Sequence, residues 1–178
     1  MKKLAWTVIA LLLAACGYVA VIAIPREAIH VERSAVTGSP ADVGLEFEEF
    51  VVSPRDTDLN LAGWWMPAQN ARATLVFIHG GGSNRTSSYF GSLDFYRAMV
   101  AQGIAMVVID LRNHGASDSD GQGLQFGRTE KYDAAAAIAW ARARNPDLPL
   151  FAMGISMGGA SLIQAVHAGA KLDGLILL

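Results

Sequence analysis

Residues 148–160 read LPLFAMGISMGGA, an apolar run followed by glycine, serine and further small residues. The first part is typical of a buried strand, and the last part is typical of a closely packed helix. Between them, residues 154–158 (GISMG) have the G-x-S-x-G spacing of a nucleophile elbow, a tight turn that lifts a serine hydroxyl above a sheet edge. Because such a turn is strained, its flanking positions must lack bulk, which Gly154 and Gly158 provide. Ser156 is therefore a candidate nucleophile, although an ordinary glycine-rich turn can show the same five residues.

A second apolar run, residues 74–80 (TLVFIHG), is typical of a parallel strand buried on both faces. It opens into residues 79–84 (HGGGSN), an HGGG-type loop whose backbone N–H groups can face an oxyanion. The helix that starts at Met157 points its own unpaired N–H groups at the same place. The two segments together predict a site for developing negative charge beside Ser156.

Strand-like and helix-like segments alternate along the chain, which predicts an α/β fold with a doubly wound, mostly parallel sheet. Trp64 and Trp65 are expected on opposite faces of their strand. The predicted strands are residues 47–53, 59–66, 74–80, 105–110, 150–153 and 172–178, and the predicted helices are residues 87–101, 128–144 and 158–168.

Three motifs, in this order, resemble those of the α/β-hydrolase superfamily: His79-Gly80, the D-x-R-x-x-G-x-S run of residues 110–117, and residues 154–158. Residues 61–67 (LAGWWMP) also look like the second strand of its membrane-anchored, serine-aminopeptidase-like branch. The resemblance covers about residues 45–178. It implies a serine hydrolase that cleaves an ester, thioester or peptide through an acyl-enzyme, with no metal ion and no organic cofactor.

The resemblance also implies a role for each site residue. Ser156 would be the nucleophile, and the N–H groups of Met157 and Gly81 would form the oxyanion hole. The supporting positions would be His79, Gly80, Gly154 and Gly158.

A serine nucleophile needs a base within hydrogen-bond reach and an acid that orients the base. In the superfamily both follow the nucleophile, where this chain has only His167 and Asp173. His167 lies about 16 Å along the predicted helix from Ser156, and Asp173 is expected at the opposite sheet edge. His79 and His114 follow strands at the correct edge, but the ring of His79 is expected to hold its own turn, and His114 to lie about 10 Å away.

The last predicted strand, residues 172–178, is apolar and has no covering helix after it. An exposed apolar edge strand is an aggregation hazard. We therefore expect the hydrolase domain to continue, with the triad acid and histidine beyond residue 178.

Residues 4–24 carry no charge and lie between Lys2-Lys3 and Pro25-Arg26. These 21 residues are long enough to span a bilayer as a helix. Residues 13–16 (LAAC) also resemble a lipobox, in which Cys16 would become a lipidated N-terminus. Because residues 17–24 stay apolar, an uncleaved anchor is favoured. The two lysines predict a cytoplasmic N-terminus and a domain outside the cytoplasm, in the periplasm or extracellular space.

The predicted organisation is an anchor (1–25), a linker (26–44) and a hydrolase domain (45–178). Beyond residue 25 the chain has 12 basic and 16 acidic side chains, which disfavours nucleic-acid binding. The single cysteine excludes an internal disulfide and a cysteine-rich zinc site. Asp56 and Asp58 are more typical of a solvated turn than of a calcium site.

The expected partners are membrane lipid, through the anchor, and a small-molecule or peptide acyl substrate; the oligomeric state is left open. The alternative function is a non-catalytic, membrane-bound binding or scaffold protein with the same fold. The elbow and the HGGG loop favour the enzyme, because a strained turn is not retained without a use.

Overall fold

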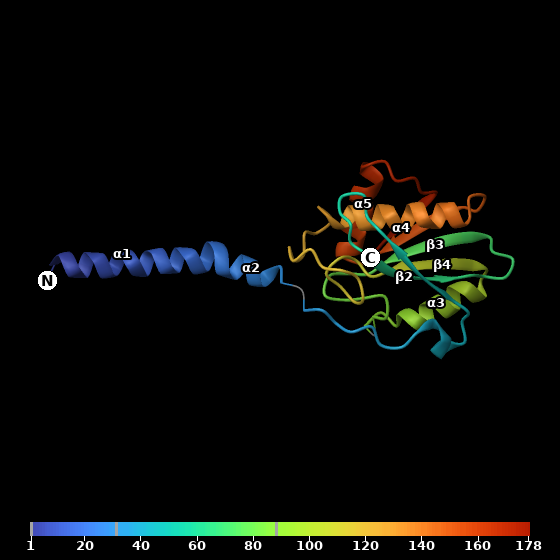
Figure 1. The fold of residues 1–178 in the computed structure, drawn as a ribbon, viewed down its shortest axis with the longest axis horizontal. Helices are drawn as coiled ribbons and strands as arrows, with labels where there is room; N and C mark the ends of the chain where they lie inside the picture. Colours follow the sequence, from blue (N-terminus) through green and yellow to red (C-terminus); the bar gives the residue numbers. More distant parts are fainter. Residues whose placement is uncertain (1, 31, 88) are drawn as a thin grey trace. The chain divides into compact units, whose positions relative to one another are not determined.

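The computed structural model describes residues 2–30, 32–87 and 89–178, and the chain divides after His30 into two compact units. The first unit is a continuous helical rod of α1 (Lys2–Tyr18), a π-type turn η1 (Val19–Ala23) and α2 (Ile24–Ala28) (Figure 1). Within the described residues, the segment Lys3–Ala28 is long and apolar enough to cross a membrane. A signal sequence near the N-terminus has the same length and composition.

The second unit is built on a mixed sheet in the order β1-β2-β4-β3-β5-β6. The strands β3, β4, β5 and β6 run parallel, while β2 is antiparallel to both β1 and β4. This confirms the predicted α/β fold with a mostly parallel sheet. The strands are β1 (Glu48–Val52), β2 (Leu61–Met66), β3 (Ala73–Ile78), β4 (Ile104–Ile109), β5 (Leu150–Gly154) and β6 (Gly174–Leu177).

Helices cover both faces of the sheet, which is why the central strands are apolar throughout. α3 (Ser92–Ala101) packs on one face, and α4 (Glu130–Arg144) and α5 (Met157–His167) pack on the other (Figure 1). Successive residues of β3 enter different cores: Val76 lies in the core under α4 and α5, and Phe77 lies in the core under α3. The sheet is therefore doubly wound, as the alternation of strands and helices predicted.

The two tryptophans of β2 divide between the two cores. Trp65 joins the core under α4, and Trp64 joins the core on the α3 face. Both rings are buried, and the Arg85 guanidinium lies 4.3 Å from the centroid of the Trp64 ring. The predicted alternation of the two side chains is correct, and neither ring lines an open groove.

The second unit begins earlier than the predicted domain boundary at residue 45. Residues 32–44 include the short 3₁₀ helix η2 (Pro40–Val43), and Val36 packs against the core on the α3 face. This segment was expected to be a linker because it has few large apolar residues. Its attachment depends on this apolar contact and on hydrogen bonds to residues 84, 86 and 117.

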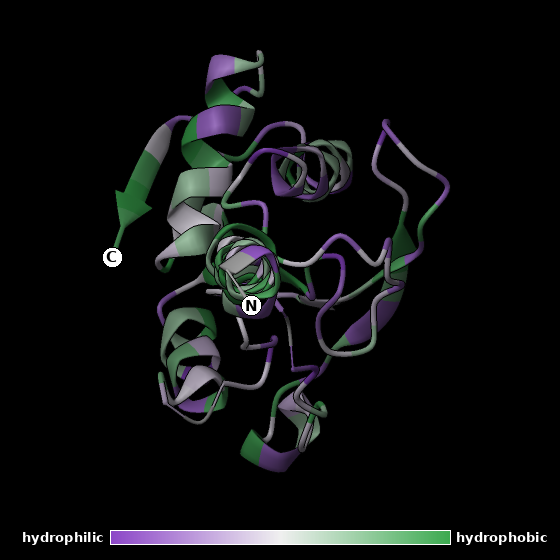
Figure 2. Ribbon diagram, turned by 90° about the vertical axis from the view of Figure 1, so that its left-hand side faces the viewer, coloured by the Kyte–Doolittle hydropathy of each residue, from purple (hydrophilic) through white to green (hydrophobic). Residues whose placement is uncertain are grey.

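β6 is the edge strand opposite β1, and among the described residues it pairs only with β5. Figure 2 shows this strand as a hydrophobic ribbon at the edge of the sheet domain. Leu175, Ile176 and Leu177 are between 37% and 47% exposed, so this strand lacks the helical cover of its neighbours.

Candidate active site

The carboxyl ends of the parallel strands bring the predicted site residues to one edge of the sheet. His79 follows β3, Asp110 and His114 follow β4, and Ser156 follows β5. Strand ends of this kind meet where open α/β sheets bind their ligands. The elbow and the HGGG loop are therefore neighbours, as expected of segments that follow adjacent strands.

Ser156 joins β5 to α5 in a strained conformation, with φ 50° and ψ −115°. Its N–H donates to the carbonyl of Leu178 at 2.7 Å, so the end of β6 holds the turn in place. The side chain is exposed, and its hydroxyl makes no hydrogen bond to any residue that the structure describes. A non-glycine residue with this backbone is uncommon and points to a functional constraint.

Two glycines allow α5 to pack directly against the strand ends. A methyl group at Gly158 would press on the carbonyl oxygens of Ile78 and His79, which are backbone atoms that cannot yield. A methyl group at Gly154 would press on the backbone of Gly158 and the residue after it. The G-x-S-x-G spacing is thus set by close contact between two main chains.

The two segments that carry the predicted oxyanion donors approach each other through a side chain. A methyl group at Gly81 would lie 3.6 Å from the Met157 sulfur. Within the described residues, neither the Gly81 N–H nor the Met157 N–H has a hydrogen-bond acceptor. The Gly82 N–H is different, because it donates to Nε2 of His114 at 3.0 Å. Gly81 and Met157 therefore offer two unused donors beside Ser156.

Both histidines at this edge hold the backbone. Nε2 of His79 accepts the Leu111 N–H at 3.1 Å, and its Nδ1 lies 2.7 Å from the Gly80 carbonyl. Nε2 of His114 accepts the Gly82 N–H, and its Nδ1 lies 2.7 Å from the Arg112 carbonyl. A nitrogen facing a carbonyl must carry the proton, so each ring is neutral with hydrogen on Nδ1.

Burial keeps these rings uncharged. The pKa of His79 is lowered to about 3, mainly by burial and next by the neighbouring His114, while the hydrogen bond to Gly80 opposes the change. Burial also lowers the pKa of His114. Because both nitrogens of each ring are already bonded, neither histidine can serve Ser156 as a base in this arrangement.

The histidine and the aspartate that follow the elbow in the chain lie away from the site. His167 ends α5, eleven residues after the nucleophile. Asp173 accepts the Leu150 N–H at 2.8 Å and pairs with Arg142 at 3.0 Å, at the opposite edge of the sheet. Both were expected in these places.

The D-x-R-x-x-G-x-S run forms a turn around a buried carboxylate. Asp110 accepts N–H groups from Arg85 at 2.7 Å and Ala116 at 2.8 Å, and it pairs with the Arg85 guanidinium at 3.1 Å. A side chain at Gly115 would occupy the space of that carboxylate. The Ser117 hydroxyl donates to the Asp110 carbonyl and accepts the Ala62 N–H, which ties the turn to β2. The motif therefore supports the site and does not itself take part in the chemistry.

Arg112 of the same run anchors three other segments, and sequence reasoning missed this network. Its guanidinium binds the carboxylates of Asp133 in α4, at 2.7 Å, and Asp56 in the β1–β2 turn, at 2.9 Å. It also lies 3.5 Å from Asp120 in the loop before α4. Asp56 is thus not simply a solvated turn residue. The available signal was weak, because Arg112 stands among other polar residues directly after an apolar strand.

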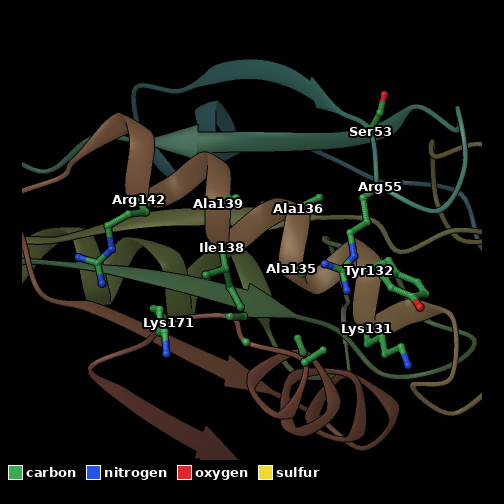
Figure 3. A pocket seen from close by; sticks show the side chains of 14 residues that line it. Ser53, Arg55, Lys131, Tyr132, Ala135, Ala136, Ile138, Ala139, Arg142 and Lys171 are labelled. Carbon is green, nitrogen blue, oxygen red and sulfur yellow. The ribbon is translucent and has the colours of Figure 1, made fainter.

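A pocket of about 450 Å³ opens beside the nucleophile. Its walls are the HGGG loop, Ile155 and Ser156, the apolar rings of Phe77 and Phe90, and residues 34, 35 and 37 from the start of the second unit. A second hollow of about 500 Å³ lies along α4 (Figure 3). It has an alanine-rich floor with Arg55, Lys131 and Lys171 around it, and Ser156 does not line it. The pocket at the elbow is therefore the candidate active site.

The family model described as serine aminopeptidase, S33 (Hydrolase_4), matches residues 69–178. A lysophosphatidylserine lipase, ABHD12 of Macaca fascicularis, is 28% identical over 109 residues, covering 54% of this chain and 26% of the lipase. The esterase Pf2001 of Pyrococcus furiosus superposes with a TM-score of 0.71 at 22% identity, covering 82% of this chain and 56% of the esterase.

A thermostable carboxyl esterase of Bacillus coagulans superposes with a TM-score of 0.61 at 24% identity, covering 75% of this chain and 44% of that enzyme. The chain thus spans about a quarter of the matched lipase and about half of each esterase. At these identities the solved structures show a shared fold.

Proposed function

Because the chain belongs to the serine aminopeptidase S33 family of α/β hydrolases, we propose that it carries the nucleophile and the oxyanion hole of a membrane-tethered serine hydrolase. The observation that carries the proposal is the strained Ser156 with two unused N–H donors beside it. A strained, exposed serine next to unpaired donors has no structural purpose in a stable domain.

In the proposed reaction, the Ser156 Oγ attacks the carbonyl carbon of an acyl substrate. The carbonyl oxygen becomes an oxyanion that accepts hydrogen bonds from the N–H groups of Met157 and Gly81. One such donor contributes on the order of 10²–10³ to the rate in comparable sites. The leaving group departs to give an acyl-enzyme, and water then releases the acid. The reaction requires a base that takes the Ser156 proton, and His79, His114 and His167 are all engaged or placed elsewhere.

The substrate that we propose is a carboxylic ester. The pocket combines apolar walls from Phe77 and Phe90 with a polar rim at Ser83 and Ser87, which suits an acyl chain with a polar headgroup or leaving group. The related proteins described above, a lysophosphatidylserine lipase and two esterases, favour esters over peptides. Thioesters react by the same steps and remain within the proposal.

The tether is the helix of the first unit. Its apolar length suits a membrane span, and Lys2 and Lys3 at its start favour a cytoplasmic N-terminus. We propose that the hydrolase domain lies on the other side of that membrane.

The test is labelling of the full-length protein with a small fluorophosphonate, which reacts only with an activated serine. We expect wild type and Ser83→Ala, a change at another pocket serine, to be labelled and Ser156→Ala to be unlabelled. Equal labelling of wild type and Ser156→Ala would remove Ser156 from the mechanism. An unlabelled wild type would favour the non-catalytic binding or scaffold protein.

A further inference from the structure

Residues 33–37, which we call the strap, have no regular secondary structure and lie on the surface of the sheet domain. They are nevertheless fixed at both ends by hydrogen bonds. The Arg33 guanidinium donates to the Ser117 carbonyl, and the Thr37 N–H donates to the Thr86 hydroxyl at 3.0 Å. An exposed segment held in this way has one preferred position.

A single buried amide holds the middle of the strap. The Asn84 Nδ2 donates to the carbonyls of Ser34 at 3.2 Å and Ala35 at 3.0 Å, and it lies 3.1 Å from the Ser34 hydroxyl. The Asn84 Oδ1 accepts the N–H of Thr86 at 2.7 Å and its hydroxyl at 2.8 Å. Asn84 is only 4% exposed, so its amide can satisfy these groups in one orientation only.

The strap is also a wall of the pocket beside the nucleophile. Ser34, Ala35 and Thr37 line that pocket together with Gly80, Gly81, Gly82 and Ser156. The Ser34 hydroxyl lies 3.5 Å from the carbonyl of Gly82, whose N–H is held by His114 on the inner side. The oxyanion loop is therefore enclosed between a buried histidine and the strap.

We propose that the strap determines which acyl groups the enzyme accepts, and that Asn84 is the positioning residue that holds it. This inference rests on the proposed function, since it concerns the same pocket. Its physical basis is that the strap lines the same pocket as Ser156 and the apolar rings of Phe77 and Phe90, so that an acyl chain bound there meets both. The acyl chain therefore contacts the strap, a segment that belongs to no strand or helix of the fold.

The first test replaces Asn84 with aspartate in the full-length protein. Aspartate keeps the shape and an acceptor for Thr86 but has no N–H for Ser34 and Ala35. We expect kcat/KM for nitrophenyl octanoate to fall about tenfold relative to nitrophenyl acetate, mainly through KM, because the longer chain loses its wall. Asn70→Asp is the matched control, because Asn70 is exposed and lies at the opposite sheet edge.

The second test adds bulk and removes no hydrogen bond. Ala35→Trp should narrow the pocket, lowering kcat/KM for the octanoate at least tenfold relative to the acetate. Ala41→Trp, at an exposed position of η2 that does not line the pocket, should leave the ratio unchanged. This variant decides the question if Asn84→Asp lowers the thermal midpoint so far that the protein does not fold.

The outcomes separate this inference from the proposed function. The role of the strap alone would be overturned if Ser156 is labelled by the fluorophosphonate in every variant while the octanoate-to-acetate ratio of Asn84→Asp and Ala35→Trp equals that of wild type. A fall of both esters by one common factor would show that Asn84 stabilises the fold without selecting substrate, and would also overturn it. Unlabelled wild type would overturn the proposed function itself.

Discussion

The residues with the clearest single task are the two buried histidines at the active edge. Each donates from Nδ1 to a carbonyl and accepts a backbone N–H at Nε2. Their ring centroids are 5.0 Å apart, so a charge on one disfavours a charge on the other. Protonation of Nε2 would place a hydrogen against the backbone N–H that it now accepts. The neutral form is therefore required for the oxyanion loop to keep its shape.

This requirement predicts a pH dependence of stability. The folded-state pKa of His79, about 3, lies below the ordinary value of 6.5. As pH falls below 6.5 the unfolded chain binds a proton that the folded chain does not, so the stability from His79 is present above 6.5 and is lost towards pH 3. The stability difference between wild type and His79→Gln should shrink by up to about 1.4 kcal/mol per pH unit in that window.

Urea unfolding at pH 7.5, 5.5 and 4.5 measures this difference. The control is Gln69→Ala, at an exposed position with no titratable side chain, whose difference from wild type should be the same at each pH. A wild-type advantage over His79→Gln that is constant across the three pH values would contradict the buried, neutral state of His79.

A second residue-level prediction concerns the elbow. Gly158→Ala places a methyl group against the carbonyl oxygens of Ile78 and His79, so α5 must move away from β3. We expect a loss of about 1–3 kcal/mol in the free energy of unfolding, and slower fluorophosphonate labelling because the Met157 N–H moves with the helix. Chemical denaturation and labelling rates measure both. Gly17→Ala, where a methyl group meets nothing within 4 Å, should change neither.

The elbow could be predicted from sequence because the main chains of α5 and the strand ends are in close contact. Only glycine fits at Gly154 and Gly158, and these two positions have a fixed spacing from the serine. The bonding of His79 to its own turn was also predictable, since it follows directly from its position after β3. The roles of Asp110 and Asn84 were not. Their partners lie 25 residues away at Arg85 and about 50 residues away at Ser34 and Ala35, and nothing local in the sequence connects them.

At the scale of elements, one guanidinium joins three segments of the active edge. Arg112 links the turn after β4 to α4, to the β1–β2 turn and to the loop before α4, and it is 2% exposed. A planar group with five donors can bind two carboxylates edge-on at once, which an ammonium cannot. Arg112 therefore fixes the relative position of these segments.

Replacement by lysine tests this role. Arg112→Lys keeps the charge but cannot bind Asp133 and Asp56 together in the same geometry, leaving buried carboxylate oxygens unpaired. We expect about 3–5 kcal/mol of destabilisation in denaturant unfolding. Arg97→Lys is the matched control, because Arg97 pairs with Asp94 on the exposed surface of α3, and it should cost less than about 1 kcal/mol. Equal effects of the two substitutions would show that the Arg112 network carries no special stability.

The strands and helices themselves were predicted to within a few residues because each has a local period or an unbroken apolar run. β3 and β4, buried on both faces, and α4, with its alanine face, are examples. The buried ion pairs and the strap could not be found in this way. Polar residues in short loops show no periodic pattern in the sequence. Whether they are buried depends on contacts with segments that are distant in the sequence.

At the scale of the whole molecule, the two units differ in whether their apolar residues are exposed or buried. Among the described residues, the helix of the first unit has no buried side chain and an apolar surface, whereas the second unit has two apolar cores. An apolar surface all round a helix suits a bilayer. This contrast supports the proposed tether.

The mature N-terminus tests the tether. We expect the protein in the membrane fraction to retain residues 1–25, because apolar residues continue from Gly17 to Ile24 beyond Cys16. Intact-mass spectrometry of the detergent-extracted protein distinguishes the alternatives. A diacylated Cys16 at the N-terminus would contradict the uncleaved anchor in favour of a lipoprotein.

The hydrogen bonds of the strap also determine at which residue a form of the protein without the apolar helix should begin. Removing the apolar helix is the usual first step, and a start at residue 45 would follow from the pattern of strands alone. Such a protein would have lost the strap, leaving Asn84 and Thr86 open to water and one side of the pocket missing. A start no later than residue 32 keeps that wall. Under the proposed function, substrate profiles measured on the shorter form would come from a pocket that lacks the strap.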